Sequence, residues 1–529
     1  MTSDQADDLA AFRIDGALGF WEIAAARPQR PAVIADDGGR TTFGELRAWS
    51  DRIAAGLLEL GLAPDDTVAV VLSNEPAFLA VQLATSQLGL YLTPVNWHLT
   101  AAEAGYILRD SEARVLVADA RFAATAAEAA DLAGIPADRR FAATQVAGWR
   151  HLDELAGLSP LPCPPPDRRL MGATMLYTSG TTGHPKGVRK RRRTATPEQA
   201  LARSLPLGSR RYGTVPGDGA HLVVAPLYHA APNGFATSSL HLGQTVVLMQ
   251  KWQPERTLQL IQEHRITSTH MVPTMFHRLL ALPEDVRRSY DVSSLKFAVH
   301  AAAPCPVEDK RAMLDWWGPV IYEYYSSTEG GGAAVNPHEW LEHPGTVGRA
   351  WEGAEVKILD EDGAPVPAGA VGAVWIRNDD PFVYHNDPEK TATAWRDGFF
   401  TAGDMGFLDE DGWLYLADRR SDLIISGGVN IYPAEIEAAL LAHPAVSDAG
   451  VIGLPDPEWG STVHAVVELT AGTDPGDRLS HELLDFCERR LARYKCPRSL
   501  EFRSLPRTPT GKLSHSALRK TILESRAQR

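Results

Sequence analysis

The stretch Tyr177-Thr-Ser-Gly-Thr-Thr-Gly-His-Pro-Lys-Gly187 decides the fold class of this chain. It begins at the end of residues 173–179, an apolar and β-branched run that predicts a strand. Its glycines let backbone N–H groups approach a phosphate, its hydroxyl groups add donors, and Lys186 adds a positive charge. We therefore predict a phosphate site with these candidate ligands: Thr178, Ser179, Gly180, Thr181, Thr182, Gly183 and Lys186.

This loop is not a Walker A loop, because Lys186 follows Pro185 and no Gly-Lys-Ser/Thr sequence opens a helix there. The simplest alternative is a flexible linker rich in serine, threonine and glycine. A linker seldom follows a buried-type strand directly, so we favour the phosphate site.

Outward from this loop, short apolar runs alternate with amphipathic stretches. Helices are predicted over residues 76–90 and 254–265, which begin with proline. Further strands are predicted over residues 67–74, 114–120, 221–226, 244–250 and 295–301. Strand–helix alternation of this kind indicates an α/β fold with mostly parallel sheets covered by helices on both faces.

Two changes in composition and in predicted secondary structure divide the chain. Residues 158–169 are rich in proline and predict a subdomain connector. After residues 417–428 a compact α+β unit follows, with helices over 432–443 and 481–494 and strands near 446–453 and 463–469. We expect an N-terminal domain over residues 1–420 and a small C-terminal domain over residues 421–529.

The composition excludes several classes of protein. Of the 529 residues, 44% are hydrophobic and 22% are charged, and the formal net charge is −14. The negative charge argues against broad nucleic-acid binding, which needs a basic face. The four cysteines form no CxxC pair, so neither a disulfide framework nor a zinc knuckle is predicted. Because no secretory signal or membrane-length apolar run occurs, we expect a cytoplasmic protein without a membrane span.

The phosphate loop resembles the signature of the adenylate-forming enzymes, which include acyl- and aryl-CoA synthetases, nonribosomal-peptide adenylation domains and firefly-type luciferases. The resemblance covers nearly the whole chain, because further matches recur in the family's order. It implies a large AMP-binding domain with a small mobile C-terminal domain. It also implies ATP, Mg²⁺ and coenzyme A as cofactors or cosubstrates.

The sequence Tyr324-Tyr-Ser-Ser-Thr-Glu-Gly330 resembles the family's aromatic–Gly–x–Thr–Glu motif. The resemblance implies that Tyr325 stacks on adenine and that Thr328 contacts the α-phosphate or the substrate carboxylate. It implies that Glu329 binds Mg²⁺ together with Thr181, as a hard cation prefers oxygen ligands. Ser326 stands where the family usually has glycine. Without the loop, an ordinary surface turn would be the alternative.

Two further segments are similar to the family's nucleotide contacts. The segment Thr401-Ala-Gly-Asp-Met-Gly406 implies that Asp404 accepts hydrogen bonds from the ribose hydroxyls, with Arg419 reaching the same ribose. The segment His300-Ala-Ala-Ala-Pro304 resembles the small-residue strand end beside adenine, where Ala301 and Ala302 replace glycines.

The C-terminal unit resembles the mobile part of the family's site. Ser421 stands at the hinge position, and hinges need tolerant backbone angles. The resemblance implies that Gly427, Gly428 and Asn430 form the loop used for thioester formation. Arg507-Thr-Pro-Thr-Gly-Lys512 resembles the element whose lysine, here Lys512, reaches the reacting carboxylate and α-phosphate.

Two other segments carry candidate roles. Pro226-Leu-Tyr-His-Ala-Ala-Pro232 resembles the segment whose histidine, here His229, lines the acyl pocket and gates the approach of the thiol. The basic run from Arg189 to Arg193 could attract the phosphates of ATP or CoA, or anionic lipid. A solvated charged surface is the reading that we favour for it.

We expect an ATP-dependent acyl-CoA synthetase that acts on a small-molecule carboxylic acid and CoA. The candidate pocket segments, residues 229–235, 300–304 and 322–327, carry aromatic residues and alanines but no charge for an amino group. This disfavours amino acids and favours an apolar fatty, aryl or bulky alicyclic acid of terpenoid or steroid type. A carrier-protein-loading enzyme, a one-step thioesterification enzyme, a luciferase-like oxygenase and a degenerate nucleotide-binding protein stay open, as does a homodimeric state.

Overall fold

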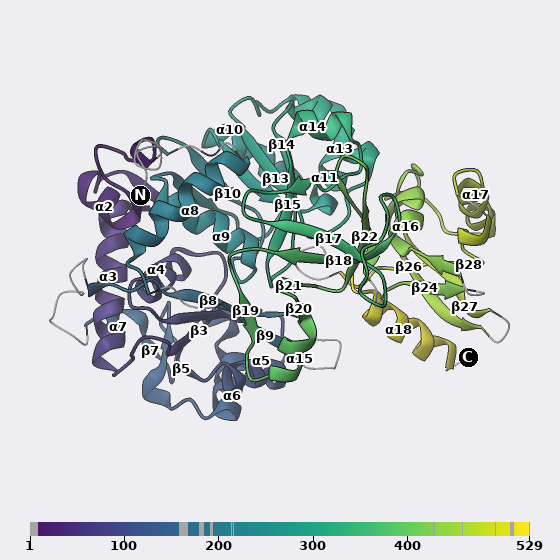
Figure 1. Ribbon diagram of the computed structural model, residues 1–529. Helices are drawn as coiled ribbons and strands as arrows, with labels where there is room; N and C mark the ends of the chain where they lie inside the picture. Colours follow the sequence, from purple (N-terminus) through teal and green to yellow (C-terminus); the bar gives the residue numbers. More distant parts are fainter. Residues whose placement is uncertain are drawn as a thin grey trace.

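The computed structural model describes residues 9–157, 168–178, 185–190, 194–212, 214, 216–419, 422–426, 429–456, 459–491, 493–507 and 513–527. Three β-sheets with their helices make up the large N-terminal part, and a three-stranded and a two-stranded sheet with helices follow at the C-terminal end (Figure 1). This arrangement confirms the predicted large α/β domain followed by a small α+β domain. The predicted boundary between residues 420 and 421 lies outside the described residues and stays a prediction.

An eight-stranded sheet carries both ends of the predicted phosphate loop. Its strands run parallel from β8 to β7, while β9 and β19 join antiparallel at one edge. All five residues of β3 are buried, because helices cover both faces of a parallel sheet. In spatial order the strands are β19 (Phe382–Tyr384), β9 (Lys186–Lys190), β8 (Ala173–Thr178), β4 (Tyr91–Pro94), β3 (Thr67–Val71), β5 (Ala113–Ala118), β6 (Arg140–Ala142) and β7 (Arg150–His151).

A nine-stranded sheet forms the second layer. Its middle strands, from β14 to β1, are parallel, and the strands at both edges are antiparallel. In spatial order the strands are β16 (Arg349–Ala350), β15 (Gly331–Val335), β14 (Ile321–Ser326), β13 (Phe297–His300), β12 (Ser268–Met271), β10 (Ala220–Val223), β11 (Thr245–Leu248), β1 (Pro31–Ile34) and β2 (Arg40–Thr42).

A third sheet is antiparallel throughout its described pairs, which differs from the expectation of mostly parallel sheets. β20–β21 and β22–β23 are hairpins with short connections, which give antiparallel pairs. β18 also pairs with β17, β21 and β22, which lie farther away in the sequence. The strands are β20 (Trp395–Arg396), β21 (Phe399–Phe400), β18 (Gly372–Arg377), β22 (Asp404–Leu408) and β23 (Leu414–Arg419), with β17 (Glu355–Leu359) beside β18.

Several helices of the N-terminal part begin at residues that favour helix starts. α4 and α10 have proline in their first turn, and Thr42 forms a capping box with Glu45 at the start of α3. The helices are α2 (Gly19–Ala26), α3 (Phe43–Glu59), α4 (Pro76–Ser86), α5 (Ala101–Asp110), α6 (Ala123–Ala133), α7 (Leu152–Gly157), α8 (Pro197–Tyr212), α9 (Ala230–His241), α10 (Pro254–Glu263), α11 (Pro273–Leu280), α12 (Glu284–Arg288), α13 (Val307–Trp317), α14 (Pro337–Glu342) and α15 (Pro388–Ala394).

One buried side chain connects the two large sheets. Asn74, just after β3, donates hydrogen bonds to the carbonyl oxygens of Ala225 at 3.0 Å and Met249 at 2.9 Å. Its side-chain oxygen accepts a bond from the Leu227 N–H at 2.8 Å. The segments after β3, β10 and β11 therefore meet at one amide group.

The C-terminal part has its own small sheet and hydrophobic core. A hydrophobic cluster that includes Ile436, Val451, Ala465 and Leu483 holds its helices on its strands. α17 begins and ends earlier than the predicted helix over 481–494, and a 3₁₀ turn occupies Arg493–Lys495. The elements are β24 (Ile424–Ser426), β25 (Val429–Ile431), α16 (Pro433–Leu441), β26 (Val446–Asp456), β27 (Gly460–Leu469), α17 (Asp477–Glu488), β28 (Ser499–Phe502) and α18 (His515–Ala527).

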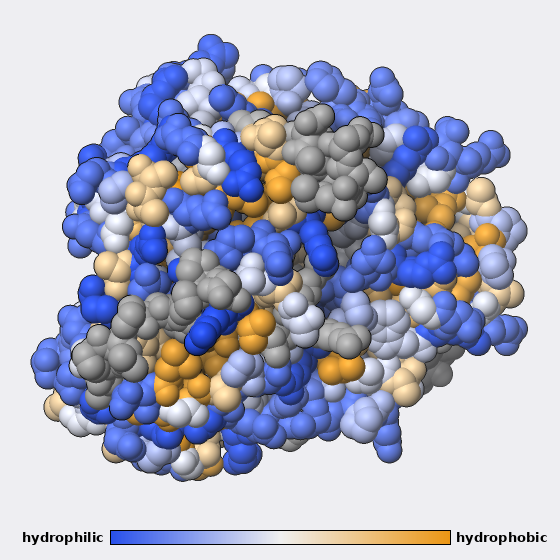
Figure 2. All heavy atoms as spheres, turned by 60° about the vertical axis from the view of Figure 1, so that its left-hand side comes forward, coloured by the Kyte–Doolittle hydropathy of each residue, from blue (hydrophilic) through white to orange (hydrophobic). Residues whose placement is uncertain are grey.

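The described surface shows no broad apolar face in the view of Figure 2. Hydrophobic residues form small patches there between hydrophilic ones. Among the described residues, no helix has the length and apolar character needed to cross a bilayer.

Candidate active site

The predicted phosphate loop joins β8 to β9. Thr178 ends β8, and its partner across the antiparallel pair is Lys186. The structure therefore brings both ends of the loop side by side, whereas residues 179–183 lie outside the described part of the chain. Gly187 allows the two strands to approach, since a Cβ atom there would lie 2.9 Å from the Tyr177 ring.

The Thr328–Glu329 pair lies in the tight turn between β14 and β15. The Ser327 N–H donates to the Gly330 carbonyl oxygen at 2.8 Å, which closes this turn. Gly331 follows in a crowded position, where a Cβ atom would lie 2.4 Å from Trp351 and 2.7 Å from Ser326. The turn thus presents Thr328 and Glu329 at the carboxyl end of a central parallel strand.

Glu329 and Lys186 meet through Tyr384, which stands in none of the sequence motifs described above. The Tyr384 hydroxyl donates to Glu329 Oε1 at 2.8 Å, and Lys186 Nζ lies 4.8 Å from the centroid of the same ring. Burial and the Glu329 carboxylate raise the pKa of Tyr384, so its hydroxyl keeps its proton and acts as the donor. One tyrosine therefore links the predicted phosphate lysine to the predicted metal ligand.

Tyr325 and Asp404, predicted to bind adenine and ribose, are in direct contact. The Tyr325 hydroxyl donates to Asp404 Oδ2 at 2.5 Å, and both side chains are buried. Asp404 begins β22 and pairs with Arg419 at the end of β23. The backbone of Arg419 thus lies beside Asp404, while its side chain lies outside the described part of the structure.

Ala302 has a backbone conformation that favours glycine. Ala302 lies just after β13. Its φ is +78°, in the left-handed region, although the residue is not a glycine. This agrees with the glycine that the resemblance places at this position, and the methyl group of alanine costs about 1–2 kcal/mol in such a conformation. The preceding residue, Ala301, is buried.

A buried charged cluster, which no sequence motif predicts, lies beneath this strand end. Lys310 on α13 donates to Glu323 Oε2 on β14 at 2.5 Å, and Lys310 Nζ lies 4.6 Å from the Trp340 ring centroid. His300 Nε2 lies 3.4 Å from the same Glu323 oxygen. Glu323 interrupts an otherwise apolar strand face, which is the sequence signal for such a pair.

His229 stands immediately before α9. It is the N-cap residue of that helix, and its ring centroid lies 4.4 Å from that of Tyr228. This places His229 after the carboxyl end of β10, on the same sheet edge as the turn that carries Thr328 and Glu329.

The predicted mobile residues lie largely outside the described part of the chain. This applies to Ser421, Gly427, Gly428 and Lys512, and of Asn430 only the backbone is described, in β25. His515, three residues beyond Lys512, is described: its Nε2 lies 2.7 Å from Glu437 Oε1 and its Nδ1 lies 3.4 Å from Asp422 Oδ2. Asp422 and Glu437 raise the pKa of His515 to about 10, against the opposing effect of burial.

The first two cations of the basic run have partners within the protein. The Arg189 guanidinium lies 4.4 Å from the Tyr91 ring centroid, and Lys190 forms an ion pair with Asp380. Residues 191–193 lie outside the described part of the chain. Arg189 and Lys190 therefore lie against the protein, and the role of the run as a whole stays a prediction.

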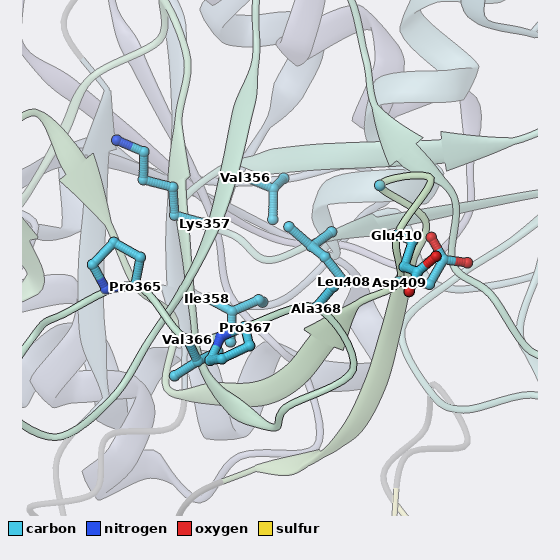
Figure 3. A pocket seen from close by; sticks show the side chains of 11 residues that line it. Val356, Lys357, Ile358, Pro365, Val366, Pro367, Ala368, Leu408, Asp409 and Glu410 are labelled. Carbon is cyan, nitrogen blue, oxygen red and sulfur yellow. The ribbon is translucent and has the colours of Figure 1, made fainter.

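A surface pocket on the third sheet has no part in the predicted site. Residues of β17 and of the loops near Pro365 and Asp409 line it (Figure 3). None of the predicted site residues lines this pocket. Within the described ranges, no group of three or more His, Cys, Asp or Glu residues could hold a metal on its own.

Comparison with known proteins identifies the family. The family described as "AMP-binding enzyme" matches residues 20–382, and "AMP-binding enzyme C-terminal domain" matches residues 435–512. The chain is 34% identical over 513 residues to the fatty acid–[acyl-carrier-protein] ligase ScoC of Streptomyces coeruleorubidus, covering 94% of each chain. It is 34% identical over 520 residues to a feruloyl-CoA synthase of an Amycolatopsis species, covering 95% of this chain and 98% of the relative.

Solved structures agree with these relatives. The amide bond synthetase McbA of Marinactinospora thermotolerans has a TM-score of 0.80 and 27% identity, with 98% of this chain and 99% of that chain covered. The anthranilate CoA ligase AuaEII in complex with anthranoyl-AMP has a TM-score of 0.84 and 25% identity, covering 95% and 97%. The chain therefore belongs to the AMP-binding, adenylate-forming family of acid ligases.

Proposed function

We propose that this enzyme joins an apolar carboxylic acid to coenzyme A at the expense of ATP, through an acyl-adenylate. The observation that carries the proposal is the convergence of Lys186, Glu329 and Tyr384, with Tyr325 and Asp404 in contact beside the same strand end. These residues come from four distant segments, and each suits a different part of a nucleotide. ATP binding has support from the family match.

In the first step, a carboxylate oxygen of the acid attacks the α-phosphorus of ATP in line. The new bond joins that oxygen to phosphorus, and the bond to pyrophosphate breaks. The protein acts mainly by positioning and by neutralising charge. A lysine such as Lys512, about 4 Å from the developing charge, contributes about 4 kcal/mol at an effective dielectric near 20. That corresponds to a rate effect on the order of a thousandfold.

In the second step, the thiol sulfur of CoA attacks the carbonyl carbon of the adenylate, and AMP leaves with the former carboxylate oxygen. The two steps need different groups at one carbonyl. We propose that residues 421–529 rotate about Ser421 between the steps. Lys512 then serves the first step, and the loop with Gly427, Gly428 and Asn430 serves the second, with His229 controlling access of the thiol.

The residues at Glu329 fit a magnesium ion bound together with nucleotide. Glu329 is buried and is oriented by Tyr384, which leaves its second carboxylate oxygen for a cation. Mg²⁺ commonly uses one or two carboxylates and completes its shell with phosphate oxygens and water. When bound there, the ion would neutralise phosphate charge, and Thr181 is the proposed second protein ligand.

The proposal is tested by incubating the enzyme with ATP, Mg²⁺, CoA and a panel of carboxylic acids. The expected products are AMP, pyrophosphate and the acyl-CoA thioester in equal amounts, measured by chromatography. Pyrophosphate exchange into ATP without CoA measures the first step alone. Thioester formed only from supplied acyl-adenylate, with no exchange for any acid, would instead support an enzyme limited to thioesterification.

A second candidate acceptor is a carrier protein. The relative ScoC, 34% identical, is named as a ligase of fatty acids to an acyl-carrier protein. The same assay distinguishes the two acceptors when CoA is replaced by a phosphopantetheinylated carrier protein. Acylation of the carrier at a higher kcat/KM than that of CoA would favour this second function.

A further inference from the structure

One face of the nine-stranded sheet is lined by imidazole and aromatic rings. Side chains alternate between the two faces of a strand, so one set of residues points toward α9. From α9, Phe235 stacks over His270 with ring centroids 5.3 Å apart and over His221 at 6.1 Å. We call this set the imidazole–aromatic wall; its members are His221, Phe235, His270, Phe297, Tyr322 and Tyr324.

The wall contains buried nitrogen atoms without a partner. His221 Nδ1 lies 2.9 Å from Ser268 Oγ, and His270 Nε2 lies 3.3 Å from the Tyr324 hydroxyl. The other ring nitrogen of each histidine, Nε2 of His221 and Nδ1 of His270, is buried and has no hydrogen-bond partner in the described structure. Burial lowers the pKa of each histidine to about 3, so both rings are neutral. A neutral imidazole can donate or accept at its remaining nitrogen, depending on the tautomer.

The packing of these strands does not by itself require histidines and aromatic residues on this face. On the opposite face of the same strands, Leu222, Met271 and Ala298 belong to a continuous hydrophobic cluster with α10, α11 and α13. Phe235 and the tyrosines of the wall belong to none of the hydrophobic clusters found in the described residues, and they are only half-buried. A buried polar atom without a partner destabilises the folded protein. Such a cost is offset if a ligand supplies the partner.

The position of the wall assigns it to the acid rather than to the nucleotide. It lies between α9, which begins after His229, and β14, which ends in the turn of Thr328 and Glu329. An acid whose carboxylate reaches that turn extends its other end along this face. The half-buried Phe235 ring lies over both imidazoles on this face.

We propose, on the basis of the adenylating function above, that the wall selects an aromatic carboxylic acid whose ring carries a hydrogen-bonding substituent. The ring stacks with Phe235 and Tyr324, and a hydroxyl or amino group on it pairs with His270 Nδ1 or His221 Nε2. A saturated alkyl chain leaves both nitrogens without a partner and offers no ring for stacking. Aromatic pairs stabilise a complex beyond the burial of their area.

The test measures ATP–pyrophosphate exchange with para-hydroxycinnamic acid, cinnamic acid and saturated acids from octanoic to hexadecanoic acid. We expect kcat/KM for the hydroxylated acid to exceed that for cinnamic acid by about tenfold and that for saturated acids by about a hundredfold. His270→Phe should abolish the preference between the two aromatic acids while keeping activity toward cinnamic acid. The control Met271→Leu changes the neighbouring residue, which faces the hydrophobic core, and should leave the preference unchanged.

Two outcomes would overturn the inference alone. The first is a saturated acid as the best substrate. The second is a His270→Phe variant that slows both aromatic acids by the same factor. If that variant does not fold, the wild-type ratio and Tyr324→Phe, which removes the hydroxyl partner of His270, decide instead. No exchange with any acid would overturn the proposed adenylation and this inference with it, whereas exchange with saturated acids alone overturns only the inference.

Discussion

The hydroxyl of Tyr384 donates a 2.8 Å hydrogen bond to Glu329, and the face of the same ring receives Lys186. Tyr384 lies on β19, which the chain adds to the edge of the eight-stranded sheet long after β8 and β9. Glu329 lies in the turn between β14 and β15 of the nine-stranded sheet. Tyr384 therefore fixes the position of the Glu329 carboxylate, beside the nine-stranded sheet, relative to Lys186 of the eight-stranded sheet.

Replacing Tyr384 with phenylalanine should loosen Glu329 without removing it. We expect the Mg²⁺ concentration for half-maximal pyrophosphate exchange to rise about tenfold, because a residue that orients a metal ligand commonly affects metal affinity to this extent. A magnesium titration of the exchange rate measures this. Val383→Ala, at the exposed neighbouring position of β19, is the control. An unchanged magnesium requirement in Tyr384→Phe would contradict the positioning role.

Lys512→Ala should lose most adenylate formation, on the order of a thousandfold. The variant should still convert supplied acyl-adenylate and CoA to thioester, because the lysine serves the first step only. Single-turnover assays of the two steps measure this separation. Wild-type exchange rates in the variant would show that another cation carries out the role.

Gly428→Trp should block the second step and spare the first. A bulky side chain in this loop would obstruct the arm of CoA on its way to the carbonyl. The expected result is normal pyrophosphate exchange with accumulation of enzyme-bound adenylate. Thioester formation from supplied adenylate at the wild-type rate would refute the proposed loop function.

Ala302→Gly should stabilise the protein. The left-handed φ of +78° costs alanine about 1–2 kcal/mol, and glycine avoids this cost while losing part of the gain to unfolded-state entropy. We expect the melting temperature to rise by about 1–2 °C, measured by differential scanning calorimetry. The matched control is Ala301→Gly: Ala301 is buried and has no positive φ, so that variant should melt lower than the wild type.

His515→Asn should destabilise the C-terminal part in a pH-dependent way. The folded protein raises the pKa of His515 from 6.5 to about 10. The stabilisation from its protonation is therefore fully present below pH 6.5 and is lost as the pH rises toward 10. The difference in melting temperature between wild type and variant should be largest near pH 6 and smallest near pH 10. A constant difference across this range would exclude the charged pairing.

The sequence predicts best those elements whose pattern is local. β3 is an uninterrupted β-branched apolar run, and its five buried residues agree with the prediction. α10 begins at a proline and is amphipathic, so its start at Pro254 follows from the sequence. The antiparallel third sheet is not among the predictions. Which residues of a strand such as β18 are buried depends on the distant strands that pair with it, and the local sequence does not show those partners.

The site shows the same division. Glu329, Asp404 and Lys186 stand in recognisable motifs, so the sequence can nominate them. Tyr384 stands in no motif that the sequence analysis uses, and its importance comes from a contact between two sheets. The conformation of Ala302 likewise depends on the path of the chain after β13. An alanine in the sequence does not indicate a left-handed φ, so this conformation is not predicted.

The antiparallel pairing of β19 with β9 also bears on the order of events during synthesis. Residues of β8 and β9 leave the ribosome long before β19 does, so the edge of β9 has no strand beside it in the growing chain. An uncovered edge can pair with another chain. The basic residues Arg189 and Lys190 lie on that edge and repel a second copy of it. A nascent chain that stops before residue 384 therefore has neither a covered β9 edge nor the tyrosine that connects Lys186 to Glu329.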